Sequence, residues 1–114
     1  MPTIYHNPRC SKSRQTLSLI QEQGIEPEIV LYLETPPSAE TIATLLNKLG
    51  IPARQLLRRG EQEYKDLNLA DTSVSEQQLI DAMANHPKLI ERPIVVNGQR
   101  AVLGRPPESV LEIL

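Results

Sequence analysis

The sequence of residues 3–14 is Thr3-Ile4-Tyr5-His6-Asn7-Pro8-Arg9-Cys10-Ser11-Lys12-Ser13-Arg14. The apolar run at its start is typical of a short strand, and the polar residues after Cys10 begin a helical pattern. A thiol at a strand-to-helix turn meets the positive end of the helix dipole and free backbone N–H groups, which favour a thiolate and a bound oxyanion. The first carboxylate is Glu22, so this turn is basic in a chain of net charge −2. We therefore predict that Cys10 is reactive rather than a small buried hydrophobic residue.

The length of 114 residues predicts a single domain over residues 1–114, and its core must be aliphatic because Phe and Trp are absent. Cys10 is the only cysteine, which excludes an internal disulfide and fits a reducing compartment. No signal-peptide pattern and no apolar run of ~18 residues is present. The slight acidity argues against nonspecific nucleic-acid binding. We expect a cytoplasmic monomer with neither a membrane nor a nucleic-acid partner.

The first third of the chain has the pattern of a strand–helix–strand unit. Residues 3–6 are predicted to form a strand, and residues 11–23 a helix that faces the core with Leu17 and Ile20 and ends at Gly24. Residues 28–33 form a second apolar run, bounded by proline and turn residues. A unit of this length predicts that its two strands are parallel.

The rest of the chain predicts helices followed by a hairpin. Helices are expected from Ser38 to Gly50, from Pro52 to Arg59, over residues 62–67, and from a capping box at Ser75 to Asn85. Asn97-Gly98 between two apolar runs predicts a hairpin with a type I′ turn. After Pro106 we expect a terminal helix with Val110, Leu111 and Leu114 inward. The fold class is therefore α/β: a thioredoxin-like, mixed four-stranded sheet flanked by helices, with a helical insertion.

The surroundings of Cys10 restrict its chemistry. Ser13 occupies the place of the second thiol in a C-x-x-C motif, so a dithiol mechanism within this chain is excluded. Thr16 occupies the place of the arginine in a phosphatase-type C-x5-R loop. Any disulfide of Cys10 must therefore form with an external thiol. His6 lies four residues earlier and is read equally well as an inert strand-end residue or as a charged partner of the thiolate.

Arginines are the remaining candidates for binding an anion. Arg92 and Arg105 each precede a proline, which fixes the backbone beside a guanidinium group suited to paired hydrogen bonds with oxyanions. Pro93 is a candidate cis-proline. A third basic group surrounds Leu56-Leu57, and the residues themselves do not say which of its arginines points inward. One cysteine and two widely spaced histidines do not make a metal site, and no glycine-rich nucleotide loop is present.

Five stretches spread over the chain resemble the ArsC family, the glutathione- and glutaredoxin-linked arsenate reductases with a thioredoxin-like fold. They are residues 4–8 with Cys10 and Ser13-Arg14, Leu31 to Pro37, Leu56-Leu57-Arg58, Glu91 to Val96, and Arg105-Pro106 with Val110 to Leu114. The resemblance implies that Cys10 is a nucleophile that forms a thiolate–arsenate ester, with His6 near the thiol. It also implies that Arg58, Arg92 and Arg105 bind the oxyanion, and it supports a cis Pro93. Glutathione is then the co-substrate and glutaredoxin a partner, with no bound cofactor.

Two other functions fit the same residues. An ArsC-like, glutathione-linked thiol oxidoreductase could act on a different substrate, with the arginines binding glutathione carboxylates. The ArsC family that the chain resembles also includes Spx-like redox-sensing regulators, which bind RNA polymerase. Such regulators usually sense oxidation through a C-x-x-C motif, which Ser13 breaks in this chain. We therefore expect an arsenate reductase in preference to these alternatives.

Overall fold

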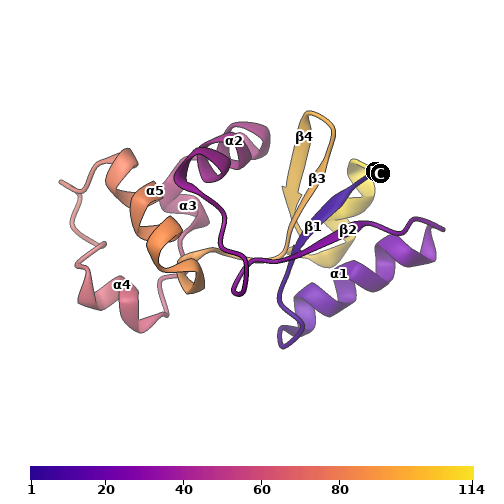
Figure 1. The fold of residues 1–114 in the computed structure, drawn as a ribbon, viewed down its shortest axis with the longest axis horizontal. Coiled ribbons are helices and arrows are strands. Elements are labelled where there is room, and N and C mark those ends of the chain that lie inside the picture. Colours follow the sequence, from indigo (N-terminus) through magenta and orange to yellow (C-terminus); the bar gives the residue numbers. More distant parts are fainter. The chain divides into compact units, whose positions relative to one another are not determined.

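A computed structural model describes all residues of the chain, 1–114, which form two compact units (Figure 1). The sheet unit consists of residues Met1–Thr35 and Arg92–Leu114, and the helical unit of residues Pro36–Glu91. The helical unit corresponds to the insertion expected from the sequence. That both units form one domain over residues 1–114 stays a prediction.

The sheet unit contains a mixed four-stranded sheet in the order β2-β1-β3-β4, flanked by helices. Its strands are β1 (Thr3–His6), β2 (Glu28–Leu31), β3 (Ile94–Asn97) and β4 (Arg100–Leu103). Strands β1 and β2 are parallel, as predicted, and the β1–β3 and β3–β4 pairs are antiparallel. Strand β2 is two residues shorter than predicted, because the backbone N–H groups of Glu34 and Thr35 donate to the carbonyl of Leu31 and close a turn there.

One face of this sheet carries the core of the unit. Ile4, Val95 and Val102 are cross-strand neighbours on that face. Helix α1 (Ser11–Glu22) packs against them with Ile20, and the C-terminal segment packs against them with Val110 and Ile113. Helix α1 ends at Glu22, one residue before the predicted end, and Gly24 is left-handed (φ +77°) at the predicted stop position. These contacts hold α1, whose N-terminus adjoins Cys10, against one face of the sheet.

The hairpin between β3 and β4 forms with a different turn from the predicted one. Asn97 pairs with Arg100, so the two loop residues are Gly98 and Gln99, and only Gly98 has positive φ (+64°). One positive φ at the first loop position fits a type II′ turn and not the type I′ turn predicted at Asn97-Gly98. Asn97 lies in β3 and not in the turn, and its side-chain Nδ2 donates to the carbonyl of Ile113.

The terminal helix is a 3₁₀-helix, η2 (Pro107–Glu112), instead of the expected α-helix. Its buried residues are spaced by three, as three residues per turn require: Pro107 and Val110, with Ile113 directly after the helix. The prediction that Leu111 points inward is therefore wrong, because Leu111 is 43% exposed. Both arginine–proline peptide bonds, Arg92-Pro93 and Arg105-Pro106, are cis, and only the first was foreseen.

The helical unit contains four α-helices and a 3₁₀ turn. They are α2 (Ala39–Leu49), α3 (Ala53–Leu56), α4 (Gln62–Asp66), α5 (Glu76–Asn85) and η1 (Pro87–Leu89). The predicted caps are confirmed: Ser38 accepts from the backbone of Thr41, Gly50 is left-handed, and Ser75 and Gln78 form a capping box. Helix α3 is shorter than predicted, because Leu57 forms an isolated bridge with Ile90. None of the helices has the length and apolar character needed to span a membrane.

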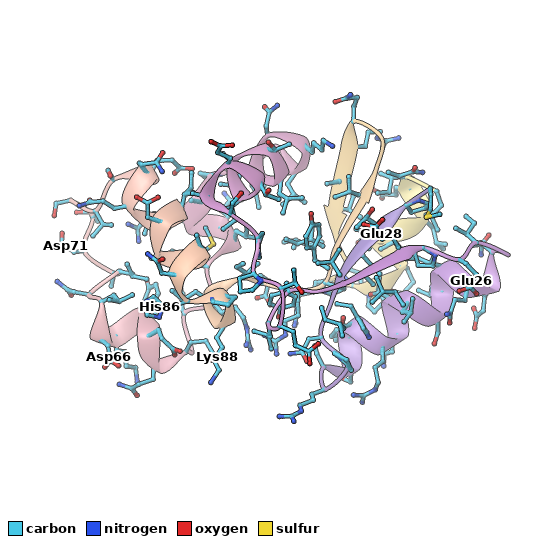
Figure 2. All side chains as sticks on the ribbon, in the orientation of Figure 1. Glu26, Glu28, Asp66, Asp71, His86 and Lys88 are labelled. Carbon is cyan, nitrogen blue, oxygen red and sulfur yellow. The ribbon has the colours of Figure 1, made fainter.

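A loop of the helical unit is held by Arg54, which donates to the carbonyl oxygens of Leu69 (2.8 Å) and Asp71 (3.3 Å). The Asp71 carboxylate, labelled in Figure 2, accepts from the backbone and the hydroxyl of Ser73. These hydrogen bonds lower the pKa of Asp71, and the nearby Arg54 charge adds to the effect. Arg54 thus has a structural role, since it holds this loop of the helical unit in place.

Candidate functional site

Cys10 is the N-cap residue of α1, as the sequence predicted. Its backbone is extended (φ −96°, ψ 123°), its N–H donates to the carbonyl of Asn7, and its carbonyl accepts from Arg14 N–H, each at 3.0 Å. Its side chain makes no capping hydrogen bond and is 8% exposed. It is absent from the apolar cluster around Ile4 and Val95. The sulfur therefore lies at the positive end of a twelve-residue helix without serving as its cap.

Arg105 places a guanidinium beside this sulfur. Its Nη2 lies 3.9 Å from Cys10 Sγ, and its Nε donates to the carbonyl oxygen of Arg92 at 2.8 Å. The second contact fixes the orientation of the planar guanidinium on the backbone of the segment before β3. The structure thus brings Cys10 and Arg105 into contact and places the Arg92 backbone next to Arg105, although Cys10 is more than eighty positions from either arginine in the sequence.

Gly104, which the sequence did not single out, allows the end of β4 to lie close to Thr16 of α1 and to Pro93. Its N–H donates to the carbonyl of Pro93 at 2.9 Å, at the end of β4. A Cβ at this position would lie 2.7 Å from Cγ of Pro93 and would also overlap Oγ1 of Thr16, a fully buried residue of α1. The available signal was a glycine directly before a candidate arginine. Only its position between α1 and Pro93 shows why glycine is needed.

His6 and Ser13 form a buried pair that anchors the loop before Cys10. Nδ1 of His6 lies 2.6 Å from Oγ of Ser13, and the same oxygen accepts from Asn7 N–H at 3.0 Å. His6 is 6% exposed and Ser13 is fully buried. Burial lowers the pKa of His6 below its usual value, and the positive charge of Arg14 lowers it further. Sequence reasoning recorded Ser13 only as the missing second thiol, because its contacts depend on how the loop folds back.

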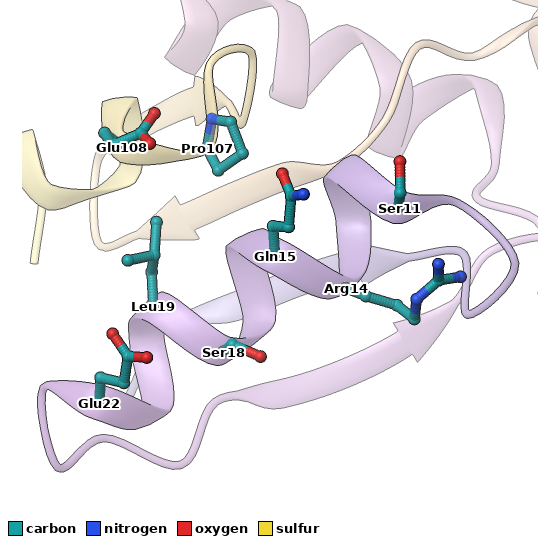
Figure 3. A pocket seen from close by; sticks show the side chains of 8 residues that line it. All are labelled: Ser11, Arg14, Gln15, Ser18, Leu19, Glu22, Pro107 and Glu108. Carbon is teal, nitrogen blue, oxygen red and sulfur yellow. The ribbon is translucent and has the colours of Figure 1, made fainter.

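Two hollows adjoin this part of the sheet unit. The larger, of about 750 Å³, follows α1 and η2 from Ser11 and Arg14 to Glu22 and Glu108 (Figure 3), and contains none of the predicted site residues. The smaller, of about 300 Å³, is lined by His6 and the three residues before Cys10, together with Leu31, Leu33 and Glu34. Arg9 and Glu34 give the smaller pocket one charge of each sign. This pocket is formed by the loop directly before Cys10.

Arg58, the third predicted oxyanion ligand, belongs to the helical unit. Its backbone N–H donates to the carbonyl of Leu89 at 2.8 Å. Its guanidinium pairs with Glu61 through Nη1 at 2.8 Å and with Glu91 through Nε at 3.6 Å. The sheet unit therefore holds four of the five predicted site residues, and a role of Arg58 in oxyanion binding stays a prediction.

The chemistry available around Cys10 is nucleophilic and anion-binding. A thiol at a helix N-terminus next to a fixed guanidinium suits attack on an electrophile that carries negatively charged oxygens. No group of three or more His, Cys, Asp and Glu side chains is placed to hold a metal ion. The candidate active site therefore consists of Cys10, Arg105 and Arg92. The His6–Ser13 pair anchors the loop before Cys10.

Comparisons with known proteins agree on one family. The family model described as "ArsC family" matches residues 5–113. "Uncharacterized protein YfgD" of Escherichia coli K12 is 62% identical over 112 residues, covering 97% of this chain and 94% of that protein. An "Arsenate reductase" of Haemophilus influenzae is 51% identical, covering 97% of both chains. The solved structure "Arsenate reductase from Vibrio cholerae" superposes with a TM-score of 0.97 at 55% identity, covering 99% of this chain and 97% of that one.

Proposed function

Since this chain belongs to the ArsC family, we propose that it is an arsenate reductase with Cys10 as its nucleophile. The observation that carries the proposal is the Cys10–Arg105 contact at the N-terminus of α1. Relatives about 50% identical over nearly the whole chain bear the name arsenate reductase. The reaction requires a nucleophile that tolerates a multiply charged oxyanion beside it, and the fixed guanidinium meets that requirement.

The proposed reaction has three steps. The Cys10 thiolate attacks arsenic and forms a S–As bond, while one arsenate oxygen leaves as water after taking up protons. A glutathione thiolate then attacks Cys10 Sγ and forms a disulfide. The electron pair of the broken S–As bond stays on arsenic, which is reduced from As(V) to As(III). Glutaredoxin then reduces the mixed disulfide and restores the Cys10 thiolate. The external thiol is obligatory because the chain has no second cysteine.

In this scheme the arginines neutralise the oxyanion. Arg105 is positioned at the sulfur, and Arg92 contributes its backbone carbonyl to that positioning. The family resemblance adds the guanidinium groups of Arg92 and Arg58 as further ligands. Fixed donors of this kind are typically worth about 10²–10³ each in rate, because they need no reorganisation when charge develops.

The pocket beside the thiol loop supports glutathione as the reductant. Glutathione is a zwitterion with two carboxylates and one ammonium group, and the pocket offers Arg9 and Glu34 with apolar surface from Leu31 and Leu33. The same pocket would serve a glutathione-linked oxidoreductase that acts on another substrate, which is our second candidate. The buried, hydrogen-bonded Ser13 gives no support to a C-x-x-C redox sensor. A cytoplasmic location and a monomeric state stay expectations.

The decisive experiment measures NADPH oxidation on adding arsenate to the protein with glutathione, glutaredoxin and glutathione reductase. The matched control is Cys10→Ser, which removes the nucleophile with the smallest change in shape. We expect arsenate-dependent turnover that is absent in Cys10→Ser. Equal turnover by both proteins would refute the mechanism. No turnover by folded protein with a titratable thiol would favour the second candidate, which is then tested with glutathione-linked disulfide substrates.

A further inference from the structure

The Arg58 guanidinium lies between two carboxylates of its own unit. Its Nη1 donates to Oε2 of Glu61 at 2.8 Å, and its Nε lies 3.6 Å from Oε1 of Glu91. All three side chains are partly exposed, so dissolved ions can reach them. One positive and two negative formal charges give this cluster a net negative charge. That is the opposite of what an arginine that binds anions requires.

The backbone that carries Arg58 and Glu91 is fixed. Arg58 N–H donates to the carbonyl of Leu89, and Glu91 N–H donates to the carbonyl of Leu56, both at 2.8 Å. The two bonds lie on either side of an isolated antiparallel bridge, and Leu56 and Leu89 are fully buried. The backbones of Arg58 and Glu91 therefore lie side by side, and Glu91 keeps its charge near Arg58.

The side chain of Glu61 is easier to displace. Glu61 is the N-cap residue of α4, but its carboxylate makes no capping hydrogen bond, and the hydrogen bond from Arg58 is the one it accepts. An ion pair between partly exposed groups is worth little, because both partners recover their hydration when the pair opens. A dissolved anion can therefore displace Glu61 from Arg58 at a small cost in free energy.

An oxyanion meets one of these carboxylates whichever edge of Arg58 it approaches. A guanidinium binds two oxygens of an anion through neighbouring nitrogens, and the available pairs are Nη1 with Nη2 and Nε with Nη2. Binding through the first pair brings the oxyanion against Glu61, which can leave. Binding through the second pair brings it against Glu91, whose backbone is fixed. Displacement of Glu61 is thus the easier route.

We propose that Glu61 is an internal competitor for the oxyanion at Arg58, and so sets how tightly the protein binds its anionic substrate. The inference rests on the proposed function, in which Arg58 is an oxyanion ligand. Glu61 acts through Arg58 and is a positioning residue. Removing its charge while keeping its shape frees the guanidinium, so Glu61→Gln tightens oxyanion binding. A purely structural ion pair gives the opposite result, because its loss leaves Arg58 less ordered.

Sulfate tests this inference without the reductase reaction, because it is a tetrahedral dianion that a thiolate does not reduce. Cys10 is the only cysteine, so the rate of its alkylation by iodoacetamide reports whether an anion occupies the site beside it. Titrating sulfate at constant ionic strength gives a Kd from the protection of Cys10. We expect Glu61→Gln to lower this Kd by about three- to fivefold, the upper range for a partly exposed ion pair.

Glu63→Gln is the matched control, since Glu63 also lies in α4 and its side chain forms no ion pair with Arg58. We expect this variant to bind sulfate as the wild-type protein does. Adding Glu61→Gln to Arg58→Ala should not lower the Kd further, because the competitor then has no guanidinium to occupy. In the coupled NADPH assay, Glu61→Gln should lower KM for arsenate by the same factor and leave kcat unchanged.

The outcomes separate this inference from the proposed function. An equal or higher sulfate Kd in Glu61→Gln would overturn the inference and leave the proposed function intact. A gain in affinity that persists in the Arg58→Ala background would also overturn it, because Glu61 would then act without Arg58. Tighter sulfate binding without arsenate turnover would support the competitor role and overturn the reductase. Sulfate that protects Cys10 in none of the proteins would overturn both, since no oxyanion would then bind beside the thiol.

Discussion

Arg105 makes two contacts that depend on the shape of the guanidinium. Nε donates to the carbonyl of Arg92 while Nη2 faces Cys10 Sγ. The short ammonium of lysine cannot make both contacts from one rigid plane. We predict that Arg105→Ala lowers kcat/KM for arsenate by about 10²–10³ and that Arg105→Lys recovers only part of this loss.

The control for Arg105 is Arg100→Ala, an exposed arginine of β4 that no observation links to the thiol. The coupled NADPH assay compares the three variants with the wild-type protein. If Arg105→Ala and Arg100→Ala had the same kcat/KM, the guanidinium at the sulfur would have no catalytic role.

His6 couples stability to pH. Its pKa in the folded protein is lowered by burial and by Arg14, whereas in the unfolded chain it stays near 6.5. Between these two values the unfolded state binds more protons, so the free energy of unfolding rises with pH. The contribution of His6 is therefore fully present above pH 6.5 and is lost as the pH falls toward the folded-state pKa.

Urea denaturation from pH 5 to 7.5 measures this effect. We predict that His6→Asn, which keeps an acceptor near the Nδ1 position, flattens the loss of stability below pH 6.5, and that His86→Gln does not. Carboxylates contribute equally in all three proteins, so the difference between the curves isolates His6. Parallel curves for His6→Asn and the wild-type protein would contradict the prediction.

The residues that sequence could identify are those whose chemistry shows locally. Cys10 stood out because it is the only thiol and lies between a strand pattern and a helix pattern. Arg92 and Arg105 stood out through the prolines that follow them. Ser13 and Gly104 could not be found in the same way, because their roles depend on a loop and a strand end far away in the sequence.

At the level of elements, the approach of α1 to the ends of β3 and β4 depends on Gly104. Because a Cβ there would overlap Thr16 and Pro93, we predict that Gly104→Ala lowers the free energy of unfolding by about 1–3 kcal/mol, the usual cost of overpacking. Gly60→Ala is the matched control, since a Cβ at Gly60 has open space around it and its φ is not positive. Urea denaturation compares the two. Equal stability of both variants would contradict the prediction, because it would show that α1 and Pro93 can move to make room for the Cβ without lowering the free energy of unfolding.

Elements were predicted best where one local signal decides them. The capping box at Ser75 and the left-handed Gly50 gave correct helix ends. The predicted types of the hairpin turn and of the terminal helix were wrong, because tertiary contacts determine both. Asn97 is drawn into β3 by its hydrogen bond to Ile113, and the packing of Val110 and Ile113 on the sheet selects a spacing of three.

For the whole molecule, the open question is what the helical unit contributes to the reaction. Arg58 lies in that unit and pairs with Glu61 and Glu91, with side chains 29%, 25% and 25% exposed. Ion pairs of such partly exposed residues contribute about 0–1 kcal/mol. A purely structural Arg58 would therefore change stability slightly and turnover not at all, whereas an oxyanion-binding Arg58, as the family resemblance implies, would change turnover far more than stability.

Arg58→Ala separates these two roles, with Arg59→Ala, an exposed neighbour, as the control. We predict that Arg58→Ala loses less than about 1 kcal/mol of unfolding free energy but loses at least about tenfold in kcat/KM for arsenate, since a charge-assisted contact to an oxyanion is worth more than one power of ten. Arg59→Ala should match the wild-type protein in both measurements. Wild-type turnover by Arg58→Ala would confine anion binding to the sheet unit, where Arg105 already stands at the thiol.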